Sequence, residues 1–266
     1  MQLFDIIPPT GAEVPVILSI PHSGTYFPDE VKDNFDPKML ETLDDTDWYL
    51  DQLYDFAASE GIMTIKANYH RWVIDLNRDP ESKPLYDDGR QITGLTPLKA
   101  FSGKDLYKNE GPDQEEIKRR LEAYYWPYYK KLEEITTDMR EKYPHVLVWD
   151  AHSIRHKVPS IQLSVFPELI LGDYEKRSAH PMLISKAIEL LGSSAYSFAH
   201  NHPFKGGHIT RYFGNPSKGV HALQLEMSKL NYMNLSEVNY NEIRASQIKD
   251  LLKNTLYHLS NIIQML

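Results

Sequence analysis

The chain has 266 residues, a formal net charge of −8 and no cysteine. A chain of this length can bury a sizeable core, and we expect one domain spanning residues 1–266. The negative charge argues against a nucleic-acid surface, and the lack of cysteine excludes disulfides and thiolate metal sites. No apolar run approaches the roughly 20 residues that a membrane helix needs, and no secretion signal opens the sequence. We therefore expect a cytoplasmic protein that does not bind membranes; the sequence indicates no oligomeric state.

Hydrophobic patterns alternate between strand and helix periods, which favours an α/β fold. Glycine and proline residues mark a loop-rich excursion at about 79–113, which is typical of a lid or binding loop. Pro127 is expected to kink the long helix that contains it. In chain order, we expect strands at 14–20, 63–67, 146–153, 161–165 and 220–227, and helices at 29–35, 39–43, 48–60, 113–143, 178–191 and 239–265.

The stretch Val146–Ser153 is the strongest predicted strand, because four apolar residues run into Asp150, His152 and Ser153. A continuous apolar run is typical of a central parallel strand covered on both faces, and open α/β sheets place their sites beyond the carboxyl ends of such strands. His152 is therefore a candidate ligand. In the alternative interpretation, Asp150 and His152 cap the strand and satisfy each other.

A second strand, Val14–Ile20, also ends in a histidine, because the turn Pro21-His-Ser-Gly24 follows it. Small residues in that turn let the backbone approach a ligand. The acids Asp44, Asp45 and Asp47 then precede a predicted helix. Capping and the helix dipole explain one or two of them, but three acids among four residues repel one another unless a cation or donors offset the charge.

An apolar strand that begins at Trp72 is expected to run into Asn77 and Arg78. The planar guanidinium of Arg78 can grip a carboxylate through two parallel hydrogen bonds, and the Asn77 amide can add a third. This pair favours an anionic substrate. In the alternative interpretation, Arg78 is buried and pairs with Asp75 for structural reasons.

Two segments nearer the carboxyl terminus carry further polar groups. Gly206 and Gly207 precede His208 and Arg211, which is typical of a flexible loop that brings a donor and a cation to a ligand. Glu226 lies near the end of a predicted strand, where a carboxylate is costly to bury unless something uses its charge.

Two histidines at strand ends, one acid and no cysteine match a catalytic zinc site with three nitrogen or oxygen ligands and a fourth position open to water. These residues lie far apart in the sequence and form no compact ligand motif, so the prediction rests on their shared position at strand ends. No phosphate-binding loop, dinucleotide glycine fingerprint or Gly-x-Ser-x-Gly elbow is present.

A set of short motifs occurs in a specific order: Pro21-His-Ser-Gly24, Asp45-Thr-Asp-Trp48, Val73-Ile-Asp-Leu-Asn-Arg78, Asp150-Ala-His-Ser153, Gly206-Gly-His-Ile-Thr-Arg211 and Gln224-Leu-Glu226. Together they resemble the N-formylglutamate amidohydrolases, also called N-formylglutamate deformylases, from about residue 15 to 235. The resemblance implies a zinc-carboxypeptidase (phosphorylase/hydrolase)-like fold, a three-layer α/β/α arrangement around a mixed, largely parallel sheet.

The resemblance implies that His22, His152 and Asp47 hold one Zn²⁺ ion, with Asp45 as the alternative acidic ligand. Carboxypeptidases usually place the acid three residues after the first histidine, whereas this chain has Thr25 there, so the sequence leaves Asp45 and Asp47 both open.

The resemblance also implies roles for the residues around the metal. Glu226 matches the general base of the carboxypeptidase-like enzymes, which takes a proton from water and delivers it to the leaving amine. A donor is expected to stabilise the oxyanion, and the candidates are Arg71, His208 and Arg211. Substrate contacts are expected from Asn77, Arg78, Arg211 and Ser153.

The implied activity is hydrolysis of N-formyl-L-glutamate to formate and L-glutamate, the last step of one route of histidine degradation. The nearest alternative is deacylation of another N-acyl amino acid, or carboxypeptidase-like cleavage of a short peptide, by the same metal with different carboxylate contacts. A non-enzymatic alternative is a binding protein for acidic metabolites. Such a binder would need no general base, so the presence of Glu226 argues for an enzyme.

Overall fold

The computed structural model describes residues 2–81, 83–85 and 93–266. Within them, a seven-stranded sheet has the order β1-β3-β2-β4-β7-β5-β6. The strands β3, β2, β4 and β7 run parallel, β1 and β5 are antiparallel to their neighbours β3 and β7, and β6 is parallel to β5. The expected mixed, largely parallel sheet is confirmed. The strand bounds are β1 Phe4–Ile7, β2 Val16–Ile20, β3 Met63–Ala67, β4 Val146–Ile154, β5 Leu169–Gly172, β6 Phe198–His200 and β7 Val220–Ser228.

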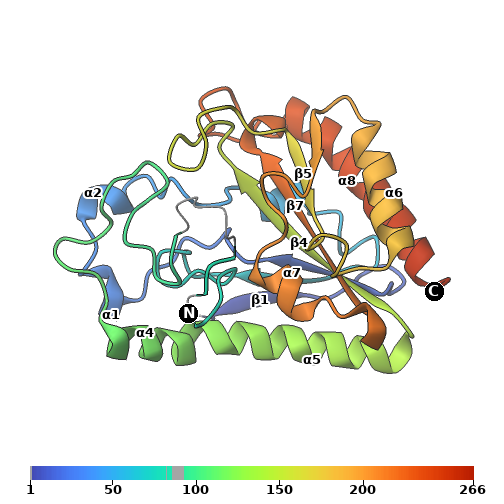
Figure 1. The fold of residues 1–266 in the computed structure, drawn as a ribbon, viewed down its shortest axis with the longest axis horizontal. Helices are drawn as coiled ribbons and strands as arrows, with labels where there is room; N and C mark the ends of the chain where they lie inside the picture. The colour runs from blue at the N-terminus through green and yellow to red at the C-terminus, as the bar shows by residue number, and fades with distance from the viewer. Residues whose placement is uncertain (1, 82, 86–92) are drawn as a thin grey trace.

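Helices cover both faces of the sheet (Figure 1). One face packs against α3 (Leu50–Leu53), α6 (Pro181–Gly192) and α8 (Glu242–Ile263). The other packs against the long helical rod that includes α5 (Trp126–Lys142) and against α7 (His208–Phe213). Two short helices, α1 (Asp29–Lys32) and α2 (Pro37–Leu40), add Val31 and Met39 to the second core. Two 3₁₀ turns, η2 (Pro216–Lys218) and η3 (Lys229–Asn231), flank β7.

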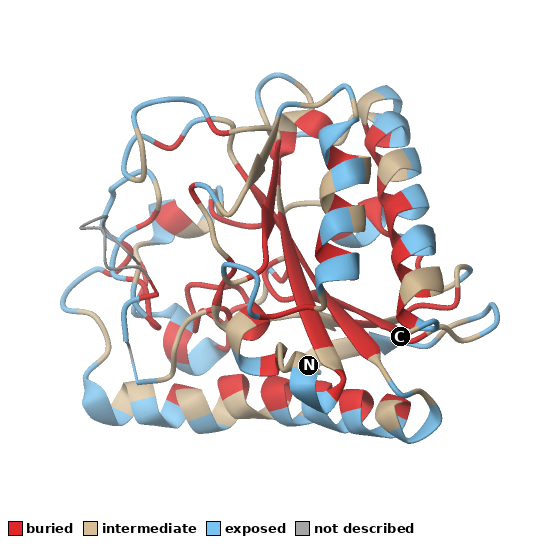
Figure 2. Cartoon of the chain, turned by 45° about the vertical axis from the view of Figure 1, so that its right-hand side comes forward, coloured by how far each residue is buried: buried red, intermediate tan, exposed pale blue. Residues whose placement is uncertain are grey.

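The alternation of side chains along each strand builds a separate core on each face of the sheet. In β2, Val16 and Leu18 join the core under α6 and α8, whereas Ile17 joins the core under α5. In β4, Trp149 lies in the first core and Val148 in the second. The central strands β2 and β4 are therefore buried on both sides, and the outer helix faces are exposed (Figure 2).

The long helix expected at 113–143 is interrupted by a π turn just before its proline. It consists of α4 (Gln114–Arg120), the π-helical η1 (Leu121–Tyr125) and α5, with Pro127 in the first turn of α5. Proline lacks the N–H that an α-helix interior requires, and the preceding π turn changes the hydrogen-bond pattern where that N–H is missing. The rod continues beyond Pro127 along one side of the molecule (Figure 1).

Other expected elements are shorter than predicted, displaced or absent. The helices expected at 29–35 and 39–43 form only over α1, at Asp29–Lys32, and α2, at Pro37–Leu40. The helix expected at 48–60 is helical only over α3, and residues 54–61 continue as turns, in which the backbone N–H of Ala57 donates to the carbonyl of Tyr54 rather than to that of Leu53. The strand expected at 161–165 is wrong, since these residues form turns and bends and Leu163 is 82% exposed.

The strand expected to begin at Trp72 is also wrong. Residues 72–77 are buried but form turns and irregular backbone, and side chains of the helical rod satisfy some of their carbonyl groups. Tyr129 donates to the Leu76 carbonyl at 2.7 Å, and Arg120 donates to that of Val73 at 3.1 Å. The apolar character of this segment therefore reflects burial against the helical rod rather than membership of the sheet.

The excursion at 79–113 contains no helix or strand in its described parts, 79–81, 83–85 and 93–113. Among the residues that the structure describes, no helix is long and apolar enough to cross a membrane.

A candidate metal centre and its cavity

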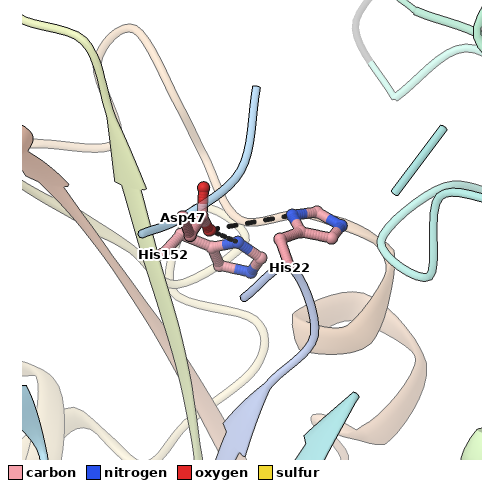
Figure 3. Close-up of side chains that lie close together, drawn as sticks. All are labelled: His22, Asp47 and His152. Atoms are coloured by element: carbon pink, nitrogen blue, oxygen red, sulfur yellow. Dashed lines mark ion pairs between the residues drawn. The ribbon is translucent and has the colours of Figure 1, made fainter. Parts of the chain in front are cut away.

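The sheet topology brings His22, Asp47 and His152 together at one edge (Figure 3). His22 follows β2 and His152 lies near the end of β4; these strands are parallel neighbours, so their carboxyl ends meet. The backbone N–H of Asp47 donates to the carbonyl of His22 at 3.0 Å, which holds the loop carrying the acid against the end of β2.

The three side chains form a compact, buried cluster. Asp47 Oδ2 lies 3.8 Å from His22 Nδ1 and 3.3 Å from His152 Nδ1, and all three residues are at most 3% exposed. His22 Nδ1 and both Asp47 oxygens are buried without a hydrogen-bond partner among the described parts of the chain. Buried polar atoms are costly without partners, and a shared cation would satisfy them. Two imidazoles and one carboxylate are a donor set that fits zinc.

Two carboxylates orient the histidine rings. Asp75 Oδ1 lies 2.9 Å from His22 Nε2, and Asp150 Oδ2 lies 3.0 Å from His152 Nε2. Each ring therefore directs Nε2 to a carboxylate and leaves Nδ1 facing Asp47, an arrangement that recurs around metal-binding histidines. The structure thus brings Asp150 and His152 into contact, as the capping interpretation expected, while His152 also faces the cluster.

Asp45 lies outside the cluster because other groups occupy its oxygens. Asp45 Oδ2 accepts a hydrogen bond from Trp72 Nε1 at 2.8 Å, and the backbone N–H of Phe101 lies 3.1 Å from both oxygens. Burial raises the pKa of this carboxyl. Of the two acids that the sequence left open, Asp47 is the one that the fold directs at the histidines.

The charges around the cluster favour a cation at its centre. Burial and the nearby Arg71 lower the pKa of His22 to about 4, so this ring is neutral and able to donate a lone pair. Burial opposes protonation of His152, but the Asp150 carboxylate outweighs it and raises the pKa of the ring well above its usual value. The same negative charge that attracts a proton to His152 would attract a metal ion.

Glu226 lies beside the cluster on the neighbouring strand. In the β4–β7 ladder it is paired directly with His152, and its carboxylate accepts a hydrogen bond from Gln224 at 3.3 Å. Burial raises the pKa of Glu226 to about 7. A carboxyl with this pKa can both accept and release a proton near neutral pH.

The cluster opens into a cavity of about 420 Å³. Arg71 and Arg78 line it as cations: Arg71 donates to Asp75 Oδ2 at 2.7 Å, and Arg78 donates to the carbonyl and hydroxyl oxygens of Thr93. Parts of the excursion form one wall, including Phe101. The other lining residues are His22, Asn77, Leu85, Gly94, Thr96, Leu98, Lys99, Ala100, Gly103, His152, Ser153, Ile154, Ser160, Ile161, Phe204, Gly207, Gln224 and Glu226.

Asn77 holds the cluster and the glycine pair together. Its Nδ2 lies 2.8 Å from His152 Nε2 and donates to Asp150 at 3.1 Å, while its Oδ1 accepts from the backbone N–H of Ile209. A Cβ atom at Gly207 would lie 2.4 Å from Asn77 Nδ2, so this approach requires glycine.

His208 and Arg211 do not line the cavity. The segment expected to be a flexible loop turns into α7 at His208, whose Nδ1 lies 3.8 Å from Asp79. Arg211 donates to the Gly206 carbonyl at 3.0 Å and stacks over the ring of Tyr174. The structure thus brings Arg71, Asn77, Arg78, Ser153 and Glu226 to the cavity and leaves His208 and Arg211 behind it.

Sequence reasoning gave no role to Phe101 or Thr93, and it considered Asp75 only as a partner of Arg78. Asp75 lies inside the Asp-Leu-Asn-Arg motif, which was the available signal for it. Phe101 and Thr93 lie in the excursion, where no periodic pattern marks the residues that face a ligand.

A buried group of two histidines and a carboxylate, open to a cavity with a nearby acid, is typical of metal-dependent hydrolases. A family model described as N-formylglutamate amidohydrolase matches residues 14–233. Two relatives, each called N-formylglutamate deformylase, are 40% identical to this chain. The match covers 92% of both chains for the Pseudomonas putida protein, and 83% of this chain and 82% of the other for the Pseudomonas aeruginosa protein. The chain belongs to the N-formylglutamate amidohydrolase family.

Solved structures share the fold at lower identity. The crystal structure of N-formylglutamate amidohydrolase from Ralstonia eutropha matches with a TM-score of 0.83 and 22% identity, over 100% of this chain and 99% of that one. A protein of Agrobacterium tumefaciens matches with a TM-score of 0.78 and 17% identity, over 99% and 96%. The three-layer α/β fold is therefore common to this group.

Proposed function

We propose that the protein is a zinc-dependent amidohydrolase that converts N-formyl-L-glutamate and water to formate and L-glutamate. The supporting observation is that His22, His152, Glu226 and two arginines line one cavity, and that Asp47 completes a buried cluster with the two histidines. The two relatives at 40% identity are called deformylases of this substrate. From the family resemblance we further propose that the reaction belongs to histidine catabolism and takes place in the cytoplasm.

His22, Asp47 and His152 would hold the zinc ion through two ring nitrogens and one carboxylate. When bound, a zinc ion at such a site lowers the pKa of water and polarises a carbonyl group. The protein's own contribution is to fix the ligands: Asp75 and Asp150 orient the rings, and burial keeps His22 neutral.

Glu226 is the proposed proton carrier. It takes a proton from the attacking water as the oxygen–carbon bond forms at the formyl carbon. It then gives that proton to the glutamate nitrogen as the carbon–nitrogen bond breaks. A pKa of about 7 suits both steps, since a group that binds its proton much more tightly would not release it to the leaving amine.

Arg71 and Arg78 are the proposed partners of the negative charges on the substrate and on the reacting oxygen. Arg78 keeps its guanidinium plane fixed through Thr93, which prepares it for a carboxylate of glutamate. Arg71, held by Asp75 beside His22, is the proposed donor to the oxygen that becomes negative during attack. Ser153 lines the same cavity and is a further proposed substrate contact.

The proposal is tested by measuring formate release from N-formyl-L-glutamate by zinc-loaded protein, chelated protein and chelated protein with zinc restored. N-acetyl- and N-succinylglutamate serve as parallel substrates. We expect release only with metal, and a preference for the formyl substrate. Faster turnover of another acyl group would move the assignment to a different N-acyl amino acid, and carboxylate binding without turnover would point to a metabolite-binding protein.

A further inference from the structure

A second cavity of about 190 Å³ adjoins the active-site cavity. The two cavities share Phe101, Ser153 and Ile154, which form a common wall at which the cavities meet. Ser102 and Lys157 on the lining of the second cavity are exposed, so its far side faces solvent. The active site therefore has a neighbouring compartment with its own opening.

Lys229 lines this second cavity and is only 2% exposed. Its Nζ donates to one group, the backbone carbonyl of Asp44, at 3.3 Å. An ammonium group carries three donors, so two of them lack a protein partner within the described ranges of the chain. A buried lysine with spare donors is a ready partner for an anion, because the burial that makes its charge costly also strengthens any ion pair that it forms.

The carboxylates on the same lining already have partners, an ion pair for Asp44 and hydrogen bonds for Asp45. Asp44 pairs with Arg155 Nη2 at 2.5 Å, and Asp45 accepts from Trp72 and from the backbone of Phe101. Arg155 Nε is buried without a hydrogen-bond partner among the described residues. The unmatched groups around this cavity are therefore donors, which favours an anionic ligand.

Ser153 lies in the linings of both cavities and can donate a hydrogen bond. Its hydroxyl oxygen accepts a hydrogen bond from the buried Tyr232 hydroxyl at 2.8 Å, so its own proton remains available for donation. Ser153 follows His152 directly in β4 and lines both cavities. An anion that leaves the metal cluster thus finds a donor in the common wall.

We propose that Ser153 and Lys229 bind the small carboxylate product of the reaction, formate, and that the second cavity is its route to solvent. This inference rests on the proposed function. Arg71 and Arg78 supply the active-site cavity with cations for the larger product, whereas Lys229 lies on the other side of the shared wall. Formate can then leave while L-glutamate still occupies the larger cavity.

A purely structural role for Lys229 makes a different prediction. Burial lowers the pKa of Lys229, while Asp47 and Asp45 oppose this shift by favouring its charged form. In a purely structural role, the lysine would only balance the charge of these buried acids. Its loss would then weaken folding and metal binding but would not change the affinity for formate relative to that for L-glutamate.

The test is product inhibition of N-formyl-L-glutamate hydrolysis by the zinc-loaded enzyme, with sodium formate and L-glutamate as separate inhibitors. We expect Lys229→Met to raise the inhibition constant of formate about tenfold or more and to change that of L-glutamate less than twofold. Lys249→Met is the matched control, because Lys249 pairs with Asp55 on the surface and lines neither cavity. It is expected to leave both constants unchanged.

Ser153→Ala provides a second variant should Lys229→Met fail to fold, and it is expected to raise the formate constant several-fold. An unchanged formate constant in a folded variant, or equal increases in both constants, would overturn the proposal. Binding of ¹³C-formate followed by NMR gives a readout that is independent of turnover. If wild-type protein releases no formate from the substrate, the proposed function fails, whereas loss of ¹³C-formate binding in Lys229→Met would still establish the anion site.

Discussion

Asp75 Oδ1 lies 2.9 Å from His22 Nε2, and this contact directs the other ring nitrogen of His22 toward Asp47 in the candidate metal site. The second oxygen of Asp75 accepts from Arg71 at 2.7 Å. Burial opposes ionisation of Asp75, but Arg71 and the other nearby cations outweigh it and hold its pKa well below the usual range. One ionised carboxylate therefore positions both a histidine of the candidate metal site and an arginine that lines the cavity.

Replacing Asp75 by asparagine removes this charge while keeping a similar shape. We expect Asp75→Asn to lower zinc affinity by roughly 10–100-fold, the range found when carboxylate partners of ligating histidines are removed. Competition with a chromophoric zinc chelator measures the affinity. Asp79→Asn is a suitable control, since Asp79 lies outside the metal cluster. Equal zinc affinity in Asp75→Asn and wild type would contradict a positioning role.

Arg78→Lys tests recognition of the substrate carboxylate. Lysine keeps the charge but loses the planar fork that Thr93 holds in place, so we expect KM for N-formyl-L-glutamate to rise about tenfold or more with a smaller change in kcat. Steady-state kinetics provide the measurement. Arg177→Lys, at a surface arginine that pairs with Glu175, controls for the exchange itself. A fall in kcat at unchanged KM would instead place Arg78 in the chemical step.

Gly207→Ala tests the close packing beneath the metal cluster. The added Cβ would lie 2.4 Å from Asn77 Nδ2, so Asn77 or the 206–207 backbone must move. We expect a loss of stability of about 1–3 kcal/mol, as is typical of overpacking, together with weaker activity. Urea unfolding measures the first and formate release the second. Gly103→Ala is the control, because Gly103 is exposed and an added Cβ there meets nothing within 4 Å, although its φ is +84°. This variant reports backbone strain without steric contact.

Three histidines at the opposite edge of the sheet predict acid sensitivity. His145 Nδ1 lies 3.0 Å from His221 Nε2, and the backbone N–H of His180 donates to His221 Nδ1. Burial, with help from the neighbouring histidines, lowers the pKa of His221 to about 4 from 6.5. Between these pH values the unfolded chain binds more protons than the folded chain. The contribution of neutral His221 to the free energy of unfolding is therefore fully present above about pH 6.5 and is lost as the pH falls toward 4.

Replacing His221 by glutamine is expected to flatten this decline. The shift of the pKa corresponds to at most about 3 kcal/mol, and partial access of water to the site reduces the effect. Urea unfolding of wild type and His221→Gln at several pH values between 4 and 7 measures the difference. Parallel curves for the two proteins would show that His221 does not carry the acid sensitivity.

Patterns along single segments predicted much of the sheet and the two histidines. The strands Val146–Ile154 and Val16–Ile20 are buried on both faces, so their continuous apolar runs predicted strands. The carboxyl ends of these strands in turn indicated His152 and His22 as candidate ligands. The choice between Asp45 and Asp47 could not be predicted from the sequence. It depends on Trp72 and Phe101, which are distant in sequence and occupy the oxygens of Asp45.

Burial by a distant element explains the incorrect strand at residues 72–78. This segment is as apolar as a central strand, yet Tyr129 and Arg120 of the helical rod satisfy its backbone. An apolar, buried segment, which is typical of a strand in a parallel sheet, therefore occurs here without forming a strand. Lys229 and the second cavity could not be predicted from the sequence either, because the lining of this cavity comes from separate parts of the chain.

The central claim is that His22, Asp47 and His152 hold the one metal ion on which turnover depends. The most direct measurement is a titration of chelated protein with zinc, with formate release from N-formyl-L-glutamate recorded at each step, for wild type and Asp47→Asn. We expect wild-type activity to rise linearly and level off at one zinc ion per chain, and the variant to stay inactive at that stoichiometry. Full turnover by the chelated protein, or wild-type behaviour in Asp47→Asn, would contradict the account.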